Sequence, residues 1–242
     1  MRCPVVTGRG ISRMIPTSMP PTMPPTAFRR QPEPAAAAAW FAGVAGQAVL
    51  ASEAESLRQA AQERPGQAGL WLCPSGMGEG EIELPLLRLR AAARGFEGDV
   101  RCALPLPLPS ESCGVVVVQH VADISAEPLA LLEECARVLI PGGYLWLLTL
   151  NPLSPYRLRW RGQGPCVAEP VTWRRRLRTA GLAPEAVSRG LGPTWAIAPD
   201  PSLQDGAGLR ASFLVRAEKR RLPLTPMRSP AKARWQTGMP TA

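Results

Sequence analysis

Three glycines alternate along a short loop that follows an apolar run. Gly76, Gly78 and Gly80 come after residues 69–73, whose sequence GLWLC favours a short buried strand. A backbone without Cβ atoms can approach a bound cofactor closely, which bulkier residues would prevent. An ordinary flexible turn has the same composition. The Gly-x-Gly-x-Gly spacing alone therefore leaves a cofactor loop and a simple turn both open.

His120 is the one histidine of the chain and directly follows the apolar run of residues 115–119. Active-site groups of open α/β sheets lie at the ends of such strands, where an imidazole could orient a substrate or act as a base. A lone histidine at this place is more often a structural residue or part of a cofactor wall. His120 is thus the single candidate catalytic residue, with a structural role as its alternative.

The six cysteines are scattered, without a CxxC pair and without the histidines of a zinc site. Their apolar surroundings favour buried thiols in a reducing compartment. The chain also lacks an apolar run of signal-peptide length and any stretch of about 18 apolar residues. We expect a cytoplasmic protein with no metal site and no membrane span.

The net charge of +9 is distributed unevenly. Residues 1–34 contribute +4, residues 157–178 contribute +6 and residues 216–242 contribute +6. Residues 35–156, which include the glycine loop, contribute −6. An acidic centre argues against a deep nucleic-acid channel, so nucleic acid is an unlikely partner. The arginines of residues 157–178 could collect an anion, but a solvated helix face explains them more simply.

The elements that must position these residues follow from the apolar pattern. Residues 35–62 favour one long or two short helices. The run of valines at residues 115–119, the helical pattern of residues 128–139 and the apolar run of residues 144–150 make a strand–helix–strand unit with parallel strands. A helix is expected at residues 171–180, and a last strand, antiparallel or at an edge, at residues 209–216.

Both ends of the chain differ from this centre in composition. Residues 1–34 are rich in Pro, Ser and Thr, and residues 219–242 are basic and rich in Pro. Such segments bury too little apolar surface to offset the entropy of ordering the backbone. We expect a disordered N-terminal tail, one domain over residues 35–218, and a loosely ordered C-terminal tail. The N-terminal segment could also reflect a start codon assigned too early.

Residues 106–152 resemble the second half of small class I S-adenosylmethionine-dependent methyltransferases. The resemblance is carried by the LPLPSES turn, the strand ending at Gln119-His120-Val121, the LLEECARVL helix and the Pro-Gly-Gly stop before the next strand. Residues 214–221, with the sequence LVRAEKRR, are similar to a bacterial subgroup of methyltransferase-domain proteins. In all, the resemblance covers residues 40–228.

This resemblance implies an α/β, Rossmann-like fold with a mostly parallel sheet of seven strands and helices on both faces. It further implies S-adenosylmethionine as the cofactor. Gly76, Gly78 and Gly80 would lie beneath its methionine moiety, while residues 102–104 would lie beside the adenine. The complete set implied to contact the cofactor is Gly76, Gly78, Gly80, Cys102, Ala103, Leu104, Gln119 and His120.

The chain departs from the family pattern at its polar anchors. No acid precedes the first glycine in residues 71–75, and none follows the second strand near residues 86–90, where a carboxylate would hold the ribose hydroxyls. Cys102 and Gly114 stand where the family has aspartates. Losing two charge-assisted contacts would weaken binding by roughly 10²–10⁴-fold. We therefore expect an eroded cofactor site.

Two functions are favoured, and a third, a nucleic-acid-associated protein that acts through its basic tails and arginine-rich helix, is opposed by the acidic centre. The first is methyl transfer from S-adenosylmethionine to a small-molecule or other unidentified acceptor, which needs little besides proximity and alignment because the sulfonium activates the methyl group. The alternative is a non-catalytic scaffold or regulatory protein that has kept the fold and lost the cofactor.

Overall fold

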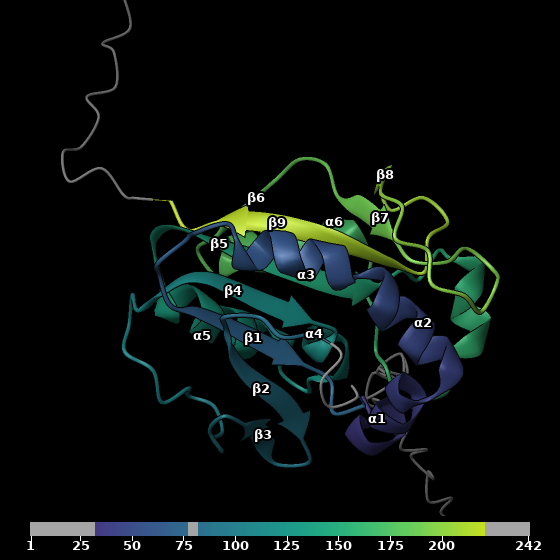
Figure 1. Ribbon diagram of the computed structural model, residues 1–242, viewed down its shortest axis with the longest axis horizontal. Coiled ribbons are helices and arrows are strands. Elements are labelled where there is room, and N and C mark those ends of the chain that lie inside the picture. Colours follow the sequence, from purple (N-terminus) through teal and green to yellow (C-terminus); the bar gives the residue numbers. More distant parts are fainter. Residues whose placement is uncertain (1–31, 77–81, 221–242) are drawn as a thin grey trace, which may run out of the picture. The chain divides into compact units, whose positions relative to one another are not determined.

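The computed structural model describes residues 32–76 and 82–220, and they form a central sheet with helices on both faces (Figure 1). Within these residues the sheet has nine strands: β1 (Gly69–Cys73), β2 (Leu87–Ala92), β3 (Gly95–Gly98), β4 (Cys113–Gln119), β5 (Leu139–Leu150), β6 (Ala183–Pro184), β7 (Arg189–Leu191), β8 (Gln204–Asp205) and β9 (Ser212–Glu218). The helices are α1 (Pro34–Ala42), α2 (Val44–Ser52), α3 (Ala54–Ala61), α4 (Val121–Ile124), α5 (Pro128–Val138) and α6 (Pro170–Thr179), with a 3₁₀ helix at Pro155–Arg159.

The strands are ordered β3-β2-β1-β4-β5-β9-β7-β8, and β6 pairs with β9. Strands β2, β1, β4 and β5 are mutually parallel, whereas β9 runs antiparallel between β5 and β7. The predicted strand–helix–strand unit is confirmed as β4–α5–β5. The last strand is antiparallel, as expected, and lies inside the sheet. The fold class is confirmed, and the predicted count of seven is only approximate because the two-residue strands β6 and β8 add to it.

Alternation along the strands divides the core into two layers. Leu70, Leu72, Val116 and Val118 face α5 and α6, while their neighbours in sequence face α1, α2 and α3. This is the period of two that a strand buried on both faces must show. Figure 1 is viewed onto the face that α3 crosses, with α5 behind the sheet.

Residues 34–61 form three helices where one or two were predicted. Gly43 has extended backbone angles and separates α1 from α2, and Glu53 separates α2 from α3. The axes of α1 and α2 meet at 77°. Within the described ranges no single helix is long and apolar enough to cross a membrane, although this bent pair meets the same criteria of length and composition.

The part of the sheet around β2 differs most from a regular alternation of strands and helices. Residues 74–76 and 82–86, the described parts of the connection from β1 to β2, contain no helix. Strand β2 then turns at once into the antiparallel β3, with Ala92 opposite Gly95. The carboxyl ends of β1, β2 and β4 are therefore bordered by loops and by the short hairpin.

Candidate functional site

A pocket of about 340 Å³ lies beside the carboxyl ends of β2 and β4. Its walls come from the β2–β3 hairpin, the loop before β4, the segment that joins β4 to α5, and the first residue of α1. Its lining is largely apolar and comprises Pro34, Ala91, Ala92, Ala93, Gly95, Phe96, Ala103, Leu104, Val121, Ile124, Ser125, Ala126, Glu127 and Leu131. Ligands of open α/β sheets bind at this edge.

Two of the predicted adenine-side residues line this pocket, namely Ala103 and Leu104. Cys102 supports the same wall, because its backbone exchanges hydrogen bonds with that of Phe96, at 2.7 and 3.0 Å. The Cys102 side chain packs against the core beneath the sheet, and burial raises the pKa of its thiol. The structure thus gathers residues 102–104 at one wall of the pocket.

Polar groups are sparse in the pocket. The end of β2 contributes Ala91, Ala92 and Ala93, so no carboxylate stands where a ribose would need one. The carboxylate on the lining belongs to the exposed Glu127, whose backbone N–H donates to Ser125 Oγ at 3.2 Å. The pocket therefore suits a flat apolar group better than a polyhydroxylated one.

Gly76 is required by the packing of α1. A Cβ at this position would lie 2.6 Å from the carbonyl oxygen of Ala38 and 2.5 Å from the backbone nitrogen of Ala42. The Gln47 side-chain amide also donates to the Gly76 carbonyl at 2.8 Å, which ties the loop to α2. Close backbone approach, expected for a cofactor, is here made to a helix. Gly78 and Gly80 lie outside the described residues.

His120 is fully buried and has a left-handed backbone conformation, with φ of 54°. Its Nε2 lies 3.1 Å from both carboxylate oxygens of Glu53, and its Nδ1 lies 3.2 Å from Asp123 Oδ2. Asp123 Oδ2 also accepts from the backbone N–H of Leu150, at 2.9 Å. His120 therefore joins the ends of β4 and β5 to the α2–α3 junction.

Glu53, which the sequence reasoning missed, is the centre of this buried network. Besides His120 it accepts hydrogen bonds from Gln119 Nε2 at 2.9 Å and from Ser212 Oγ at 2.6 Å. Gln119 Oε1 in turn accepts from Trp71 Nε1 at 3.1 Å. An acid inside an alanine-rich helical stretch was the available signal, because a buried carboxylate must be paired. Its partners could not be inferred, since they lie 66, 67 and 159 residues away along the chain.

The electrostatics favour a charged imidazole at this place. Burial acts to lower the pKa of His120, but the carboxylates of Glu53 and Asp123 outweigh it and raise that pKa to about 9. For Asp123 the direction of the burial effect is reversed: burial raises the pKa of this acid, and the nearby His120 acts to lower it. With both ring nitrogens protonated, each donates to a carboxylate. Such an imidazolium holds its proton and is poorly suited to act as a base.

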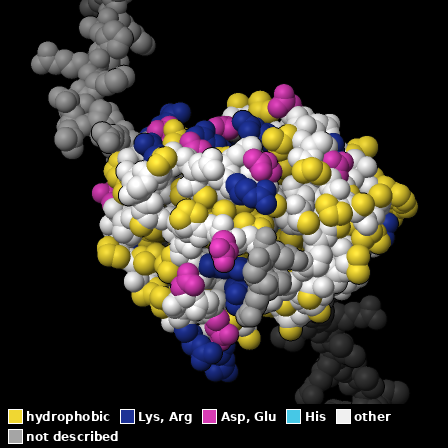
Figure 2. Space-filling view, in the orientation of Figure 1, with side chains coloured by type: hydrophobic (Ala, Val, Ile, Leu, Met, Phe, Trp, Pro, Cys, Tyr) yellow, Lys and Arg dark blue, Asp and Glu magenta, His cyan; other side chains and the backbone are white. Residues whose placement is uncertain are grey.

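Neither Gln119 nor His120 lines the apolar pocket, and both side chains have zero exposure. In Figure 2 no histidine is visible on the displayed face, and basic and acidic side chains are interspersed across it. The described parts of the chain hold no group of three or more His, Cys, Asp or Glu side chains placed to bind a metal ion. Cys73, Cys102, Cys113 and Cys135 are free thiols.

The strand order is that of a Rossmann-like α/β fold, which solved methyltransferases share. Residues 81–147 match the family model described as a methyltransferase domain, a segment that runs from before β2 into β5. The resemblance seen in the sequence is thereby confirmed for this part of the chain.

A methyltransferase from a bacterium matches part of the chain in sequence. The ubiquinone biosynthesis O-methyltransferase of Parvibaculum lavamentivorans is 37% identical over 73 residues, which are 29% of this chain and 29% of that protein. The chain thus matches less than a third of the length of this relative.

Two solved structures share the fold. An S-adenosylmethionine-dependent methyltransferase of Thermotoga maritima, described as a possible histamine N-methyltransferase, has a TM-score of 0.51 and 18% identity, over 72% of this chain and 94% of that one. A putative methyltransferase of Haloferax volcanii, solved in complex with a methyltransferase activator, has a TM-score of 0.50 and 14% identity, over 79% and 100%.

Proposed function

We propose that this chain is an S-adenosylmethionine-dependent methyltransferase that holds the adenine of its cofactor in the apolar pocket beside β2 and β4. The observation that carries the proposal is the place of the pocket at the carboxyl edge, with the predicted residues Ala103 and Leu104 on its wall. A purine presents two apolar faces, which fit the alanine and leucine lining. The methyl acceptor is unidentified.

The cofactor would supply an electrophilic methyl group, and the protein would supply alignment. Phe96, Leu104 and Ile124 would hold the adenine and exclude water from it. Glu127 on the lining is the carboxylate available to the ribose hydroxyls. The His120 network would keep the ends of β4 and β5 in register, so that the pocket walls keep their shape.

Calorimetric titration with S-adenosylmethionine and with its demethylated product tests this proposal. We expect saturable binding at sub-millimolar to millimolar concentration, weakened by the missing polar anchors. Ala103→Trp should remove the binding because its indole fills the pocket. Thr179→Trp, at an exposed position of α6, is the matched control and should leave it unchanged. No binding to the folded wild-type protein at millimolar ligand would contradict the proposal.

The alternative, a non-catalytic scaffold, is supported by two specific observations. The end of β2 offers alanines in place of an acid, and α1 covers the backbone of Gly76. A scaffold would keep its fold and show neither cofactor binding nor transfer of a radiolabelled methyl group. The same titration therefore separates the two functions.

A further inference from the structure

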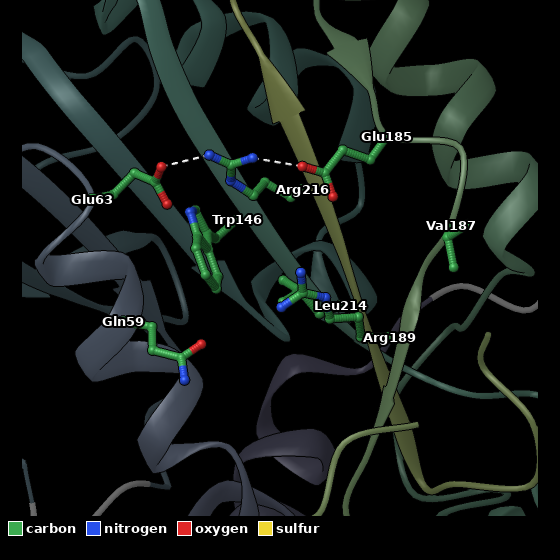
Figure 3. Close-up of a pocket in the computed structure, with 8 residues that line it drawn as sticks. All are labelled: Gln59, Glu63, Trp146, Glu185, Val187, Arg189, Leu214 and Arg216. Carbon is green, nitrogen blue, oxygen red and sulfur yellow. Dashed lines mark hydrogen bonds and ion pairs between the residues drawn. The ribbon is translucent and has the colours of Figure 1, made fainter. Parts of the chain in front are cut away.

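A second pocket, of about 240 Å³, lies on the face of the sheet that α3 crosses, away from the apolar pocket. Its floor is formed by Trp146 on β5 and Leu214 on β9, which have 4% and 3% exposure. Gln59 on α3 and Glu63, which follows that helix, border the pocket on one side. Glu185, Val187 and Arg189 border it on the other. Figure 3 looks into this cavity.

One end of the pocket carries an ion-pair system of two carboxylates and one guanidinium group. Arg216 places Nη2 2.5 Å from Glu63 Oε1 and Nη1 2.5 Å from Glu185 Oε1. The guanidinium also lies 3.8 Å from the centre of the Tyr144 ring, which fixes its plane. Arg174 also donates to the Glu185 backbone carbonyl at 3.1 Å. The second oxygen of each carboxylate can still accept a hydrogen bond from a bound ligand.

The other end carries the exposed guanidinium group of Arg189. The Arg189 side chain makes no hydrogen bond or ion pair with residues 32–76 and 82–220. Its register partners are Leu214 on β9 and Asp205 on β8, so Asp205 is the nearest acid by position in the sheet. In Figure 3 the Arg189 side chain lies beside Leu214, and the Glu63–Arg216–Glu185 system lies across the opposite end.

This arrangement selects a class of ligand by its charges. A simple anion would meet the carboxylates of Glu63 and Glu185, and a simple cation would meet Arg189. A neutral molecule would remove water from both ends without replacing its hydrogen bonds, which costs binding free energy. A molecule with an amine at one end, an apolar middle and a carboxylate at the other complements the pocket: its amine matches the carboxylates, its middle the Trp146 and Leu214 floor, and its carboxylate Arg189.

We propose that this pocket binds a small zwitterion of that kind, with its carboxylate on Arg189, its apolar part on Trp146 and Leu214, and its ammonium group on Glu63 and Glu185. The volume equals that of about eight liquid water molecules, which suits a ligand of the size of an amino acid. The site is separate from the proposed cofactor pocket. Its occupation therefore does not depend on the proposed methyl transfer.

The probe for the test is ε-aminocaproate, with caproate and hexylamine as partners that each lack one charge. The full-length protein is titrated by calorimetry, and the indole N–H signal of Trp146, assigned with Trp146→Phe, is followed by NMR. We expect ε-aminocaproate to bind at millimolar concentration or below and to shift this signal saturably. Each single-charge probe should bind at least about tenfold more weakly, because one charge-assisted contact is lost.

Variants assign the two ends. Arg189→Gln should weaken ε-aminocaproate at least about tenfold while bringing its affinity close to that of hexylamine, and Asp205→Asn should leave binding intact or strengthen it. Glu185→Gln keeps an acceptor for Arg216 and should weaken ε-aminocaproate and hexylamine but not caproate. Arg178→Gln, at an exposed position of α6, is the matched control. Equal binding of all three probes, unchanged affinity in folded Arg189→Gln, or no binding at about 10 mM would overturn the proposal.

Discussion

Glu53 accepts hydrogen bonds from three side chains that arrive from the ends of two strands, and it does so without contact with solvent. Removing one member of a buried charge system usually costs more than the pair itself contributes, because the remaining charge is left uncompensated. Here the remaining charge would be an imidazolium, held by Asp123 alone.

Glu53→Gln should therefore lower the free energy of unfolding by about 3–5 kcal/mol. Urea denaturation followed by circular dichroism measures this change. Glu55→Gln is the matched control, because Glu55 is 57% exposed and forms a surface ion pair with Arg58, at 3.2 Å. A loss below about 1 kcal/mol, comparable to that of the control, would show that the buried network is not coupled to stability.

The His120 pKa sets a direction for the dependence of stability on pH. The pKa is about 9 in the folded protein and ordinarily 6.5, so the folded state binds the proton more tightly than the unfolded state. The stabilisation is complete below pH 6.5 and is lost as the pH rises through 9. We expect the free energy of unfolding to fall by up to about 3 kcal/mol across this window.

Urea titrations at several pH values between these limits measure the slope. The decline should be much smaller in His120→Gln, which keeps donors and acceptors but does not titrate. A stability that stays constant or rises across the window in the wild-type protein would contradict a charged His120.

Secondary elements were predictable where apolar residues follow one clear period. The valines of β4, the helical face of α5 and the apolar run of β5 determine their elements locally, and the expected parallel unit formed. The second strand lay near the predicted residues 86–90. The hairpin with β3 was not predictable, because Gly95 and Gly98 have positive φ angles that a sequence with several glycines does not disclose.

At the glycine loop the residue type was predictable but its physical reason was not. Gly76→Ala should force α1 away from the loop, since its Cβ would meet the backbone of Ala38 and Ala42 within 2.6 Å. We expect a loss of about 1–3 kcal/mol in the free energy of unfolding, as for an overpacked contact. Thermal and urea denaturation measure it. Ser75→Ala, at the exposed neighbour, should change stability little, and equal effects of both substitutions would refute the tight contact.

At the scale of the molecule, the two hydrophobic layers seen in residues 32–76 and 82–220 are formed by residues between Ala37 and Ala217. We propose that the domain predicted for residues 35–218 folds on this apolar surface. A chain trimmed to residues 32–220 should unfold at nearly the same temperature as the full-length chain, as measured by calorimetry. A large fall in the unfolding temperature would show that one of the tails contributes to the folded core.

The side of the molecule that carries the proposed cofactor pocket was only partly predictable at this scale. Residues 102–104 came together because they lie close to each other in sequence, and the pocket formed where the ends of β2 and β4 meet. The roles of Gln119 and His120 depend instead on Glu53, which comes from a distant helix junction. Tertiary pairing of this kind leaves no local pattern in the sequence.

The contact between α1 and Gly76 also has a consequence for the rate of ligand binding. A ligand that must reach the backbone of Gly76 finds it covered by α1, so α1 has to detach first. In stopped-flow mixing with S-adenosylmethionine, the observed rate should then level off at high ligand concentration, at the opening rate of α1. Ala38→Gly removes a methyl group and loosens α1 through its lower helix propensity, and it should raise that limiting rate. A rate that increases linearly over the whole range would mean that the cofactor enters without moving the helix.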